Sequence, residues 1–135
     1  MRVLVVEDDF ISRRLLCRYL QAHGESDVAV NGNEAIGAFK QVLLANEYYD
    51  LVCLDIMMPG MDGQETLKRL RALEREHDVP EDKRAKVIMT TALEDHDNVM
   101  SAFSNDCNGY VVKPIEKKKF LETLAEIGLP VTING

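Results

Sequence analysis

The sequence predicts an α/β protein built on a doubly wound parallel sheet of five strands. Short apolar runs, rich in β-branched residues, alternate along the chain with longer segments whose apolar residues recur at helical spacing. The short runs are nearly continuous in apolar residues, which is typical of parallel strands that are buried on both faces. Strict alternation of strands and helices indicates right-handed crossovers, which place helices on both faces of the sheet.

The first two pairs of strand and helix have clear boundaries. Residues 3–6 are a continuous apolar strand, and the apolar residues within 10–20 recur at helical spacing until Gly24 stops the helix. The second strand is predicted over residues 28–30. An Asn-Gly-Asn turn then supplies a cap for a helix whose apolar stripe covers residues 35–43.

The next two pairs flank the longest predicted loop. Residues 51–54 form the third strand, and leucines at helical spacing within residues 67–73 mark the third helix. A polar stretch over residues 74–86, which contains a proline, is the longest loop candidate. The fourth strand is predicted over residues 87–89, and a short fourth helix around residues 99–103 follows it.

The last pair completes one domain. Residues 110–112 form the fifth strand, and apolar residues within 115–127 line the fifth helix. We expect a single domain over residues 1–128, followed by a short C-terminal tail over residues 129–135. A chain of 135 residues has the length of one domain and leaves no room for a separate output module.

Charge and composition disfavour several classes of function. The 16 basic and 23 acidic residues give a net charge of -7, which disfavours direct binding of nucleic acid or of an anionic membrane. No apolar run approaches the roughly 20 residues of a membrane span, so we expect a soluble, cytoplasmic protein. Cys17, Cys53 and Cys107 are odd in number and far apart, which is typical of reduced thiols and not of a disulfide framework or a metal knuckle.

Polar residues with reactive side chains follow four of the predicted strands. Glu7 and Asp8 follow the first strand, Asp55 the third, Thr91 the fourth and Lys113 the fifth. Parallel strands have their carboxyl ends at one edge of the sheet, where ligands of such folds bind, so we expect these side chains to lie close together. Any one of the acids, or Thr91, could be only a helix cap, and Lys113 could be only a solvated surface lysine, but the set indicates a site.

Converging carboxylates repel one another unless a cation neutralises them, and this requirement predicts a divalent metal. Mg²⁺ prefers oxygen ligands and is typically held by one or two carboxylates together with phosphate oxygens. Lys113 and Thr91 offer an ammonium group and a hydroxyl group to such oxygens, and Asp55 could attack phosphorus as a carboxylate nucleophile. Asp9 opens the first helix, and we expect it to cap that helix instead.

Four motifs give the sequence a family resemblance. They are Val-Val-Glu-Asp-Asp at residues 5–9, Leu-Asp-Ile-Met-Met-Pro-Gly-Met-Asp-Gly at 54–63, Met-Thr-Thr-Ala at 89–92 and Gly-Tyr-Val-Val-Lys-Pro at 109–114. In this order and at this spacing they are highly specific. Across about residues 2–127 the sequence resembles the receiver domain of two-component response regulators, of the stand-alone, CheY-like kind. The resemblance implies a flavodoxin-like fold of five β/α units with the strand order 2-1-3-4-5.

The resemblance also implies a role for each residue at the strand ends. Asp55 would be the phosphoacceptor. Asp8, Asp55 and the main-chain carbonyl of Met57 would ligate Mg²⁺, which would be the cofactor, and Glu7 would act through a bound water. Lys113 would hold a phosphoryl oxygen.

A switch and a set of partners are implied as well. Thr91 and Tyr110 would form a switch pair that rearranges the surface made by the fourth helix, the fifth strand and the fifth helix. A histidine kinase or a histidine phosphotransfer protein would supply the phosphoryl group, and a downstream protein target, in a chemotaxis-type pathway or a phosphorelay, would read that surface. The protein would be a monomer or a phosphorylation-dependent dimer. Pro114 would follow a cis peptide, and Gly60 and Gly63 would suit turns.

Two other function classes fit parts of the pattern. A Mg²⁺-dependent phosphatase with an aspartate nucleophile, of the haloacid dehalogenase type, needs a second Asp two residues after the nucleophile, where this sequence has Met57. A flavodoxin-like electron carrier needs a first loop rich in hydroxyl groups, whereas residues 7–9 are acidic. We therefore expect a signalling protein that catalyses only its own phosphorylation and dephosphorylation, and not an enzyme with a turnover substrate.

Overall fold

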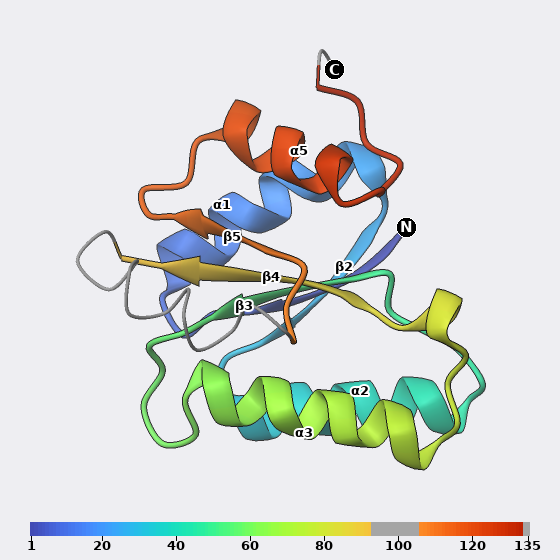
Figure 1. Cartoon of the computed structure of the whole chain (residues 1–135). Helices are drawn as coiled ribbons and strands as arrows, with labels where there is room; N and C mark the ends of the chain where they lie inside the picture. Colours follow the sequence, from blue (N-terminus) through green and yellow to red (C-terminus); the bar gives the residue numbers. More distant parts are fainter. Residues whose placement is uncertain (93–105, 134–135) are drawn as a thin grey trace.

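The computed structural model describes residues 1–92 and 106–133, which form a sheet between two layers of helices (Figure 1). The strands are β1 (Arg2–Val6), β2 (Glu25–Ala29), β3 (Leu51–Asp55), β4 (Lys86–Thr91) and β5 (Gly109–Val112). The helices are α1 (Phe10–Leu20), α2 (Gly32–Leu44), α3 (Gly63–Glu76) and α5 (Lys117–Glu126), with short 3-10 helices over Gln21–His23 and Glu81–Lys83. The fourth predicted helix, around residues 99–103, lies outside the described residues.

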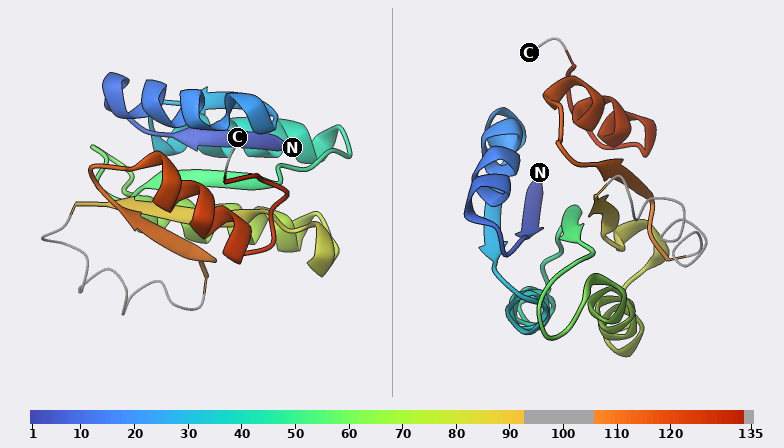
Figure 2. Two further views of the ribbon diagram at one scale, coloured as in Figure 1. Left: turned by 90° about the horizontal axis from the view of Figure 1, so that it is seen from above. Right: turned by 90° about the vertical axis from the view of Figure 1, so that its left-hand side faces the viewer.

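The strands are parallel and lie in the order β2-β1-β3-β4-β5, which confirms the predicted doubly wound, flavodoxin-like sheet. Helices α1 and α5 cover one face of the sheet, and α2 and α3 cover the other (Figure 2). In the register, Val6 pairs with both Ala29 and Leu54, and Asp55 pairs with Thr90. The carboxyl ends of the strands therefore reach the same edge of the sheet.

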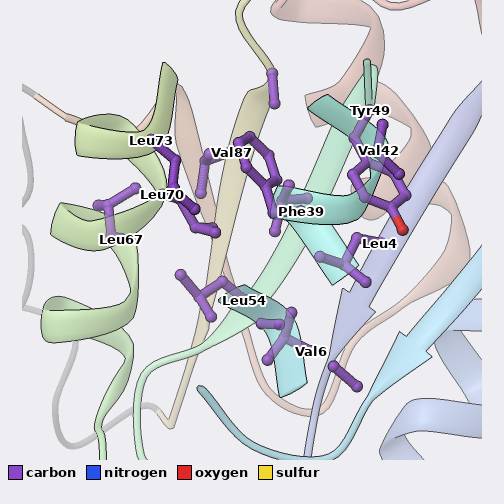
Figure 3. Packing of buried hydrophobic residues seen from close by; sticks show 14 of the residues in the cluster. Leu4, Val6, Phe39, Val42, Tyr49, Leu54, Leu67, Leu70, Leu73 and Val87 are labelled. Atoms are coloured by element: carbon purple, nitrogen blue, oxygen red, sulfur yellow. The ribbon is translucent and has the colours of Figure 1, made fainter. Parts of the chain in front are cut away.

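The core lies in two layers, one on each face of the sheet. Successive side chains of a strand point to opposite faces, so Leu4 and Val6 pack under α2 and α3, whereas Val3 and Val5 pack under α1 and α5. In Figure 3, which shows the first layer, Phe39 of α2 and leucines of α3 face side chains of β1, β3 and β4. These four apolar side chains of β1 are completely or almost completely buried, as their continuous apolar run predicts.

The second strand covers Glu25–Ala29 and not the predicted residues 28–30. It lies at the edge of the sheet and pairs with β1, so several of its residues face solvent. These residues are not apolar throughout, so an apolar run does not mark the whole strand in the sequence. Val30 falls outside the strand, and its main-chain N–H donates a hydrogen bond to Glu34 Oε1, 2.9 Å away. The amide of Glu34 in turn donates to Asn31 Oδ1, which caps α2 as predicted.

The predicted loop over residues 74–86 is shorter than expected, because α3 continues to Glu76. Glu74 is buried and accepts hydrogen bonds from Arg71 Nη1 and from the main-chain N–H of Ala85, both at 2.8 Å. A charged residue in a polar stretch usually indicates an exposed position. Here Arg71 and the main-chain N–H of Ala85 both donate to the Glu74 carboxylate, so this charged side chain can be buried.

The chain after α5 returns to the core. Leu129 and Val131, which lie in the predicted tail, pack against the core layer under α1 and α5. The main-chain N–H of Leu129 donates to the carbonyl of Leu124 at 3.0 Å. In the part of the chain that the structure describes, no helix is long and apolar enough to cross a lipid bilayer.

Candidate functional site

The ends of β1, β3, β4 and β5 bring the predicted site residues to one edge of the sheet. Glu7 and Asp8 follow β1, Asp55 ends β3, Thr91 ends β4 and Lys113 follows β5. The sheet continues into these loops, since the main-chain N–H of Lys113 donates to the carbonyl of Thr91 at 2.7 Å. The fold thus delivers these side chains to the place where ligands of doubly wound folds bind.

Three carboxylates form an acidic cluster at this edge. One oxygen each from Glu7, Asp8 and Asp55 lies within 4.8 Å of the others. Glu7 is 0% exposed and Asp55 is 4% exposed, whereas Asp8 is open to solvent. A donor set made of carboxylate oxygens suits a hard divalent cation such as Mg²⁺. Asp9 is not part of this cluster, because its carboxylate accepts a hydrogen bond from the main-chain N–H of Ser12 and caps α1 as predicted.

Lys113 lies against the acidic cluster and is closer to Glu7 than to Asp55. Its Nζ is 2.6 Å from Glu7 Oε1 and 3.5 Å from Asp55 Oδ1. Burial lowers the pKa of Lys113, but the hydrogen bond to Glu7 and the charge of Asp55 outweigh it, and the net pKa is raised. Lys113 is therefore a cation near neutral pH.

The surroundings of Glu7 in the acidic cluster disfavour the ionised form of its carboxyl group. The pKa of Glu7 is raised to about 8: burial is the largest cause, the nearby carboxylate of Asp55 also raises it, and Lys113 opposes the rise. Neighbouring carboxyl groups resist ionising together unless a cation offsets their charge. A divalent cation bound at the cluster would therefore favour the ionised form of Glu7.

The loop after β3 closes back on Asp55. The main-chain N–H of Met57 donates to Asp55 Oδ1 at 3.3 Å, so the amide of Met57 lies beside the acidic cluster, and its carbonyl stays a predicted ligand. Gly60 has a φ of 79°, as a turn requires. Gly63 is expected in a turn, but it is the first residue of α3, where it allows a close approach between main chains. A Cβ there would lie 2.6 Å from the Asp55 carbonyl oxygen, so a glycine lets the start of α3 approach β3 this closely.

The predicted switch pair lies on neighbouring strands. Thr91 is buried, and its hydroxyl donates to the carbonyl of Ala92 at 3.1 Å. Tyr110 is half-buried, packs against the core layer under α2 and α3, and lies opposite Met89 in the register, two residues before Thr91. The peptide bond before Pro114 is cis, as predicted. The switching motion stays a prediction, and the fourth helix of the predicted output surface lies outside the described residues.

Sequence reasoning missed two residues of α1 that contact the loops of the site. Arg13 Nη1 is 2.9 Å from the carbonyl oxygen of Glu7 and 3.5 Å from that of Asp8. The hydroxyl of Tyr19 donates to the carbonyl of Ile115 at 3.0 Å, just beyond the strand-end lysine. No motif marks these contacts, because helical spacing shows which residues share a face of α1 and not which loop that face meets.

Comparisons with known proteins agree with this architecture. A family model described as the response regulator receiver domain matches residues 3–125. The chain belongs to this family. The receiver domain is 37% identical over 123 residues to the regulatory protein VanRB of Enterococcus faecalis, and the match covers 90% of this chain and 50% of VanRB. It is 33% identical over 128 residues to the chemotaxis protein CheY of Treponema pallidum, with 93% and 81% of the two chains covered.

Solved structures of receiver domains superpose on this one. The chemotaxis protein CheY4 of Vibrio cholerae matches with a TM-score of 0.70 at 25% identity, and the match covers 93% of this chain and 97% of CheY4. The receiver domain of the Arabidopsis thaliana histidine kinase CKI1 matches with a TM-score of 0.75 at 25% identity, covering 93% and 88%. Among the curated relatives, this receiver domain spans about half the length of VanRB and 44% of that of the Bacillus subtilis regulator ResD.

Proposed function

We propose that this receiver domain accepts a phosphoryl group on Asp55 and passes the signal to a protein partner. The observation that carries this proposal is the convergence of the acidic cluster with Lys113 at the carboxyl edge of the sheet. Phosphoryl transfer depends on positioning and on offsetting the charge of the transferred group. The site supplies a carboxylate to attack, an ammonium group within 3.5 Å of it and the oxygen ligands of a cation.

In the proposed reaction, a carboxylate oxygen of Asp55 forms a bond to phosphorus. The bond between phosphorus and a histidine nitrogen of the donor breaks, and the nitrogen leaves with the electron pair of that bond. A histidine kinase or a histidine phosphotransfer protein is the proposed donor. Lys113 would hold an oxygen of the phosphoryl group, and the product is an acyl phosphate on Asp55.

We propose Mg²⁺ as the cofactor of this reaction. Asp8, Asp55 and the main-chain carbonyl of Met57 would hold it, and Glu7 would act through a water molecule. When bound, the ion supplies positive charge that neutralises phosphoryl oxygens. Two facts support the choice, namely the all-oxygen donor set and the crystal structure of the CKI1 receiver domain, which is a complex with Mg²⁺ and BeF3⁻.

We propose that the output is a change of surface around β5 and α5. Thr91 and Tyr110 would relay the phosphorylation of Asp55 to the surface made by the fourth helix, β5 and α5. A groove of about 670 Å³ runs along β5 and α5, the two described elements of this surface. The proposed partner is a downstream protein target in the cytoplasm. The domain that binds it would cover residues 1–128 and would act as a monomer or as a phosphorylation-dependent dimer.

The aspartate-nucleophile phosphatase remains the competing proposal, and one residue disfavours it. The position two residues after Asp55 belongs to Met57, whose side chain is 64% exposed and carries no group that can transfer a proton. Release of phosphate from many unrelated phosphate esters, at a rate that Asp55→Asn abolishes, would favour this alternative.

Incubation with acetyl phosphate and Mg²⁺, followed by measurement of the intact mass, tests the proposed function. We expect the wild type to gain the mass of one phosphoryl group and Asp55→Asn to gain none. Asp82→Asn is the matched control, because Asp82 is exposed in the 3-10 helix before β4, at the opposite edge of the sheet. A wild type that gains no mass with Mg²⁺, or an Asp55→Asn variant that still gains it, would overturn the proposal.

A further inference from the structure

The side chain of Arg13 in α1 contacts the main chain of Glu7 and Asp8, two residues of the acidic cluster. Arg13 lies one turn into the helix, and its Nη1 is 2.9 Å from the carbonyl oxygen of Glu7 and 3.5 Å from that of Asp8. The guanidinium carbon also lies over the ring of Phe10, 5.5 Å from its centroid. These contacts give the Arg13 side chain a defined place beside the acidic loop.

The main chain of this loop is held from several directions. The N–H of Glu7 donates to the carbonyl of Ala29 at the end of β2, and Asp9 is engaged as the cap of α1. Arg13 secures the two carbonyl groups between these anchor points. The Asp8 side chain is exposed, so the position of its carboxylate depends on its main chain more than on packing of neighbours.

The choice of acceptor atoms matters for metal binding. Arg13 donates to main-chain carbonyl oxygens of the acidic residues. An arginine that bonded the carboxylates themselves would compete with a cation for the same oxygens. Arg13 can therefore order the loop without itself occupying the carboxylate oxygens of Glu7 and Asp8.

We infer that Arg13 is a positioning residue, which fixes the main chain of Glu7 and Asp8 so that their carboxylates face a divalent cation together with Asp55. This inference rests on the proposed function, because it concerns the same cation site. Groups that orient metal ligands from outside the coordination sphere typically change metal affinity by about 10- to 100-fold when they are removed. Arg13 acts on the ligands through their backbone, so we expect an effect of about 10-fold.

The neighbouring residue provides a matched control. Arg14 is also on α1, carries the same charge and lies over the same Phe10 ring at 6.0 Å, but it is exposed, and its side chain makes no hydrogen bond to the acidic loop in residues 1–92 and 106–133. Loss of a positive charge near a cation site should by itself strengthen Mg²⁺ binding. Simple electrostatics therefore predicts tighter binding in both Arg13→Gln and Arg14→Gln, whereas positioning predicts weaker binding in Arg13→Gln alone.

Titration calorimetry with MgCl₂ tests the inference on the wild type, Arg13→Gln, Arg13→Lys and Arg14→Gln. We expect about 10-fold weaker binding in Arg13→Gln, partial recovery in Arg13→Lys, and binding at least as tight as wild type in Arg14→Gln. Amide hydrogen exchange in chelator-treated protein gives a second readout that needs no metal. Exchange at residues 7–9 should be faster in Arg13→Gln and unchanged in Arg14→Gln.

The outcomes separate this inference from the proposed function. If the wild type binds no Mg²⁺, the proposed cation site is wrong and the inference falls with it. If the wild type binds Mg²⁺ and Arg13→Gln binds it as tightly as Arg14→Gln does, Arg13 has no positioning role and the proposed function stands. Should Arg13→Gln fail to fold, Arg13→Met decides, because it keeps an aliphatic side chain but has no donor group, and affinity and exchange equal to those of the wild type would overturn the inference.

Discussion

At the scale of single residues, the contact between Lys113 and Glu7 shapes the charge of the site. Lys113 follows β5 and Glu7 follows β1, so two strands that are not neighbours in the sheet are joined by a contact of 2.6 Å between Lys113 Nζ and Glu7 Oε1. The sequence places both residues at strand ends and predicts that they converge. The family resemblance implies that the lysine holds a phosphoryl oxygen on Asp55, and in the folded chain its ammonium group lies nearer to Glu7 than to Asp55.

Glu7 should make the stability of the cation-free protein depend on pH. The pKa of Glu7 is raised in the folded protein, to about 8, so above its unfolded pKa the folded state keeps a proton that the unfolded state has released. Rising pH then favours unfolding. We expect the stability of the wild type, relative to Glu7→Gln, to fall between about pH 5 and about pH 8, as measured by urea unfolding with a chelator present.

Glu76→Gln is the control for this experiment, because Glu76 is exposed at the end of α3. It should show the pH dependence of the wild type. A stability difference between wild type and Glu7→Gln that stays constant from about pH 5 to about pH 8 would show that the pKa of Glu7 is not raised by folding.

At the scale of elements, Arg71 joins α3 to the amino ends of β4 and β5. Its guanidinium donates to Glu74 and to the carbonyl of Ala85, both at 2.8 Å, and to Asn108 Oδ1 at 3.2 Å. Asn108 Oδ1 also accepts the main-chain N–H of Val87 at 2.8 Å. One arginine thus ties together three segments at the edge of the sheet opposite the acidic cluster.

Removal of the Glu74 carboxylate should destabilise the protein strongly. Glu74→Ala leaves the largely buried guanidinium of Arg71 without its counter-charge and the N–H of Ala85 without its acceptor. Breaking a buried ion pair from one side typically costs about 3–5 kcal/mol. We expect a loss of this order in the free energy of unfolding, measured in urea.

Glu76→Ala, two residues further along α3 and exposed, is the matched control. It should change the free energy of unfolding by less than about 0.5 kcal/mol. Similar losses in the two variants would mean that the contacts of Glu74 contribute little beyond those of a surface residue.

At the scale of the whole molecule, the proposed cation site draws on distant parts of the chain. Glu7 and Asp8 follow β1, while Asp55 ends β3, and the segment between them includes α1, β2 and α2. The acidic cluster therefore exists only in the folded chain. An ion that binds it binds the native state in preference to the unfolded one, so cation binding and folding are linked.

Mg²⁺ should raise the stability of the wild type by mass action. At about 100 times its dissociation constant, the expected gain is about 2.7 kcal/mol in the free energy of unfolding, and a chelator should reverse it. Asp8→Asn should lose most of this gain without harming the fold, because Asp8 is exposed, whereas the exposed Asp82→Asn should keep it. Thermal unfolding with and without MgCl₂ measures the effect, and an equal gain in Asp8→Asn would place the ion elsewhere.

Local patterns in the sequence specify the alternation of strands and helices, the burial of β1 and β3, and the set of polar residues at the carboxyl edge of the sheet. The first two features follow from local periodicity, which is a property of short stretches of chain. The third follows from the rule that parallel strands end at one edge of the sheet. The tertiary structure alone decided that Lys113 lies nearer to Glu7 than to Asp55, that Arg13 reaches the carbonyls of the acidic loop and that Glu74 is buried. These contacts depend on how each helix is rotated against the sheet and on which loops then meet, and a one-dimensional pattern does not contain that information.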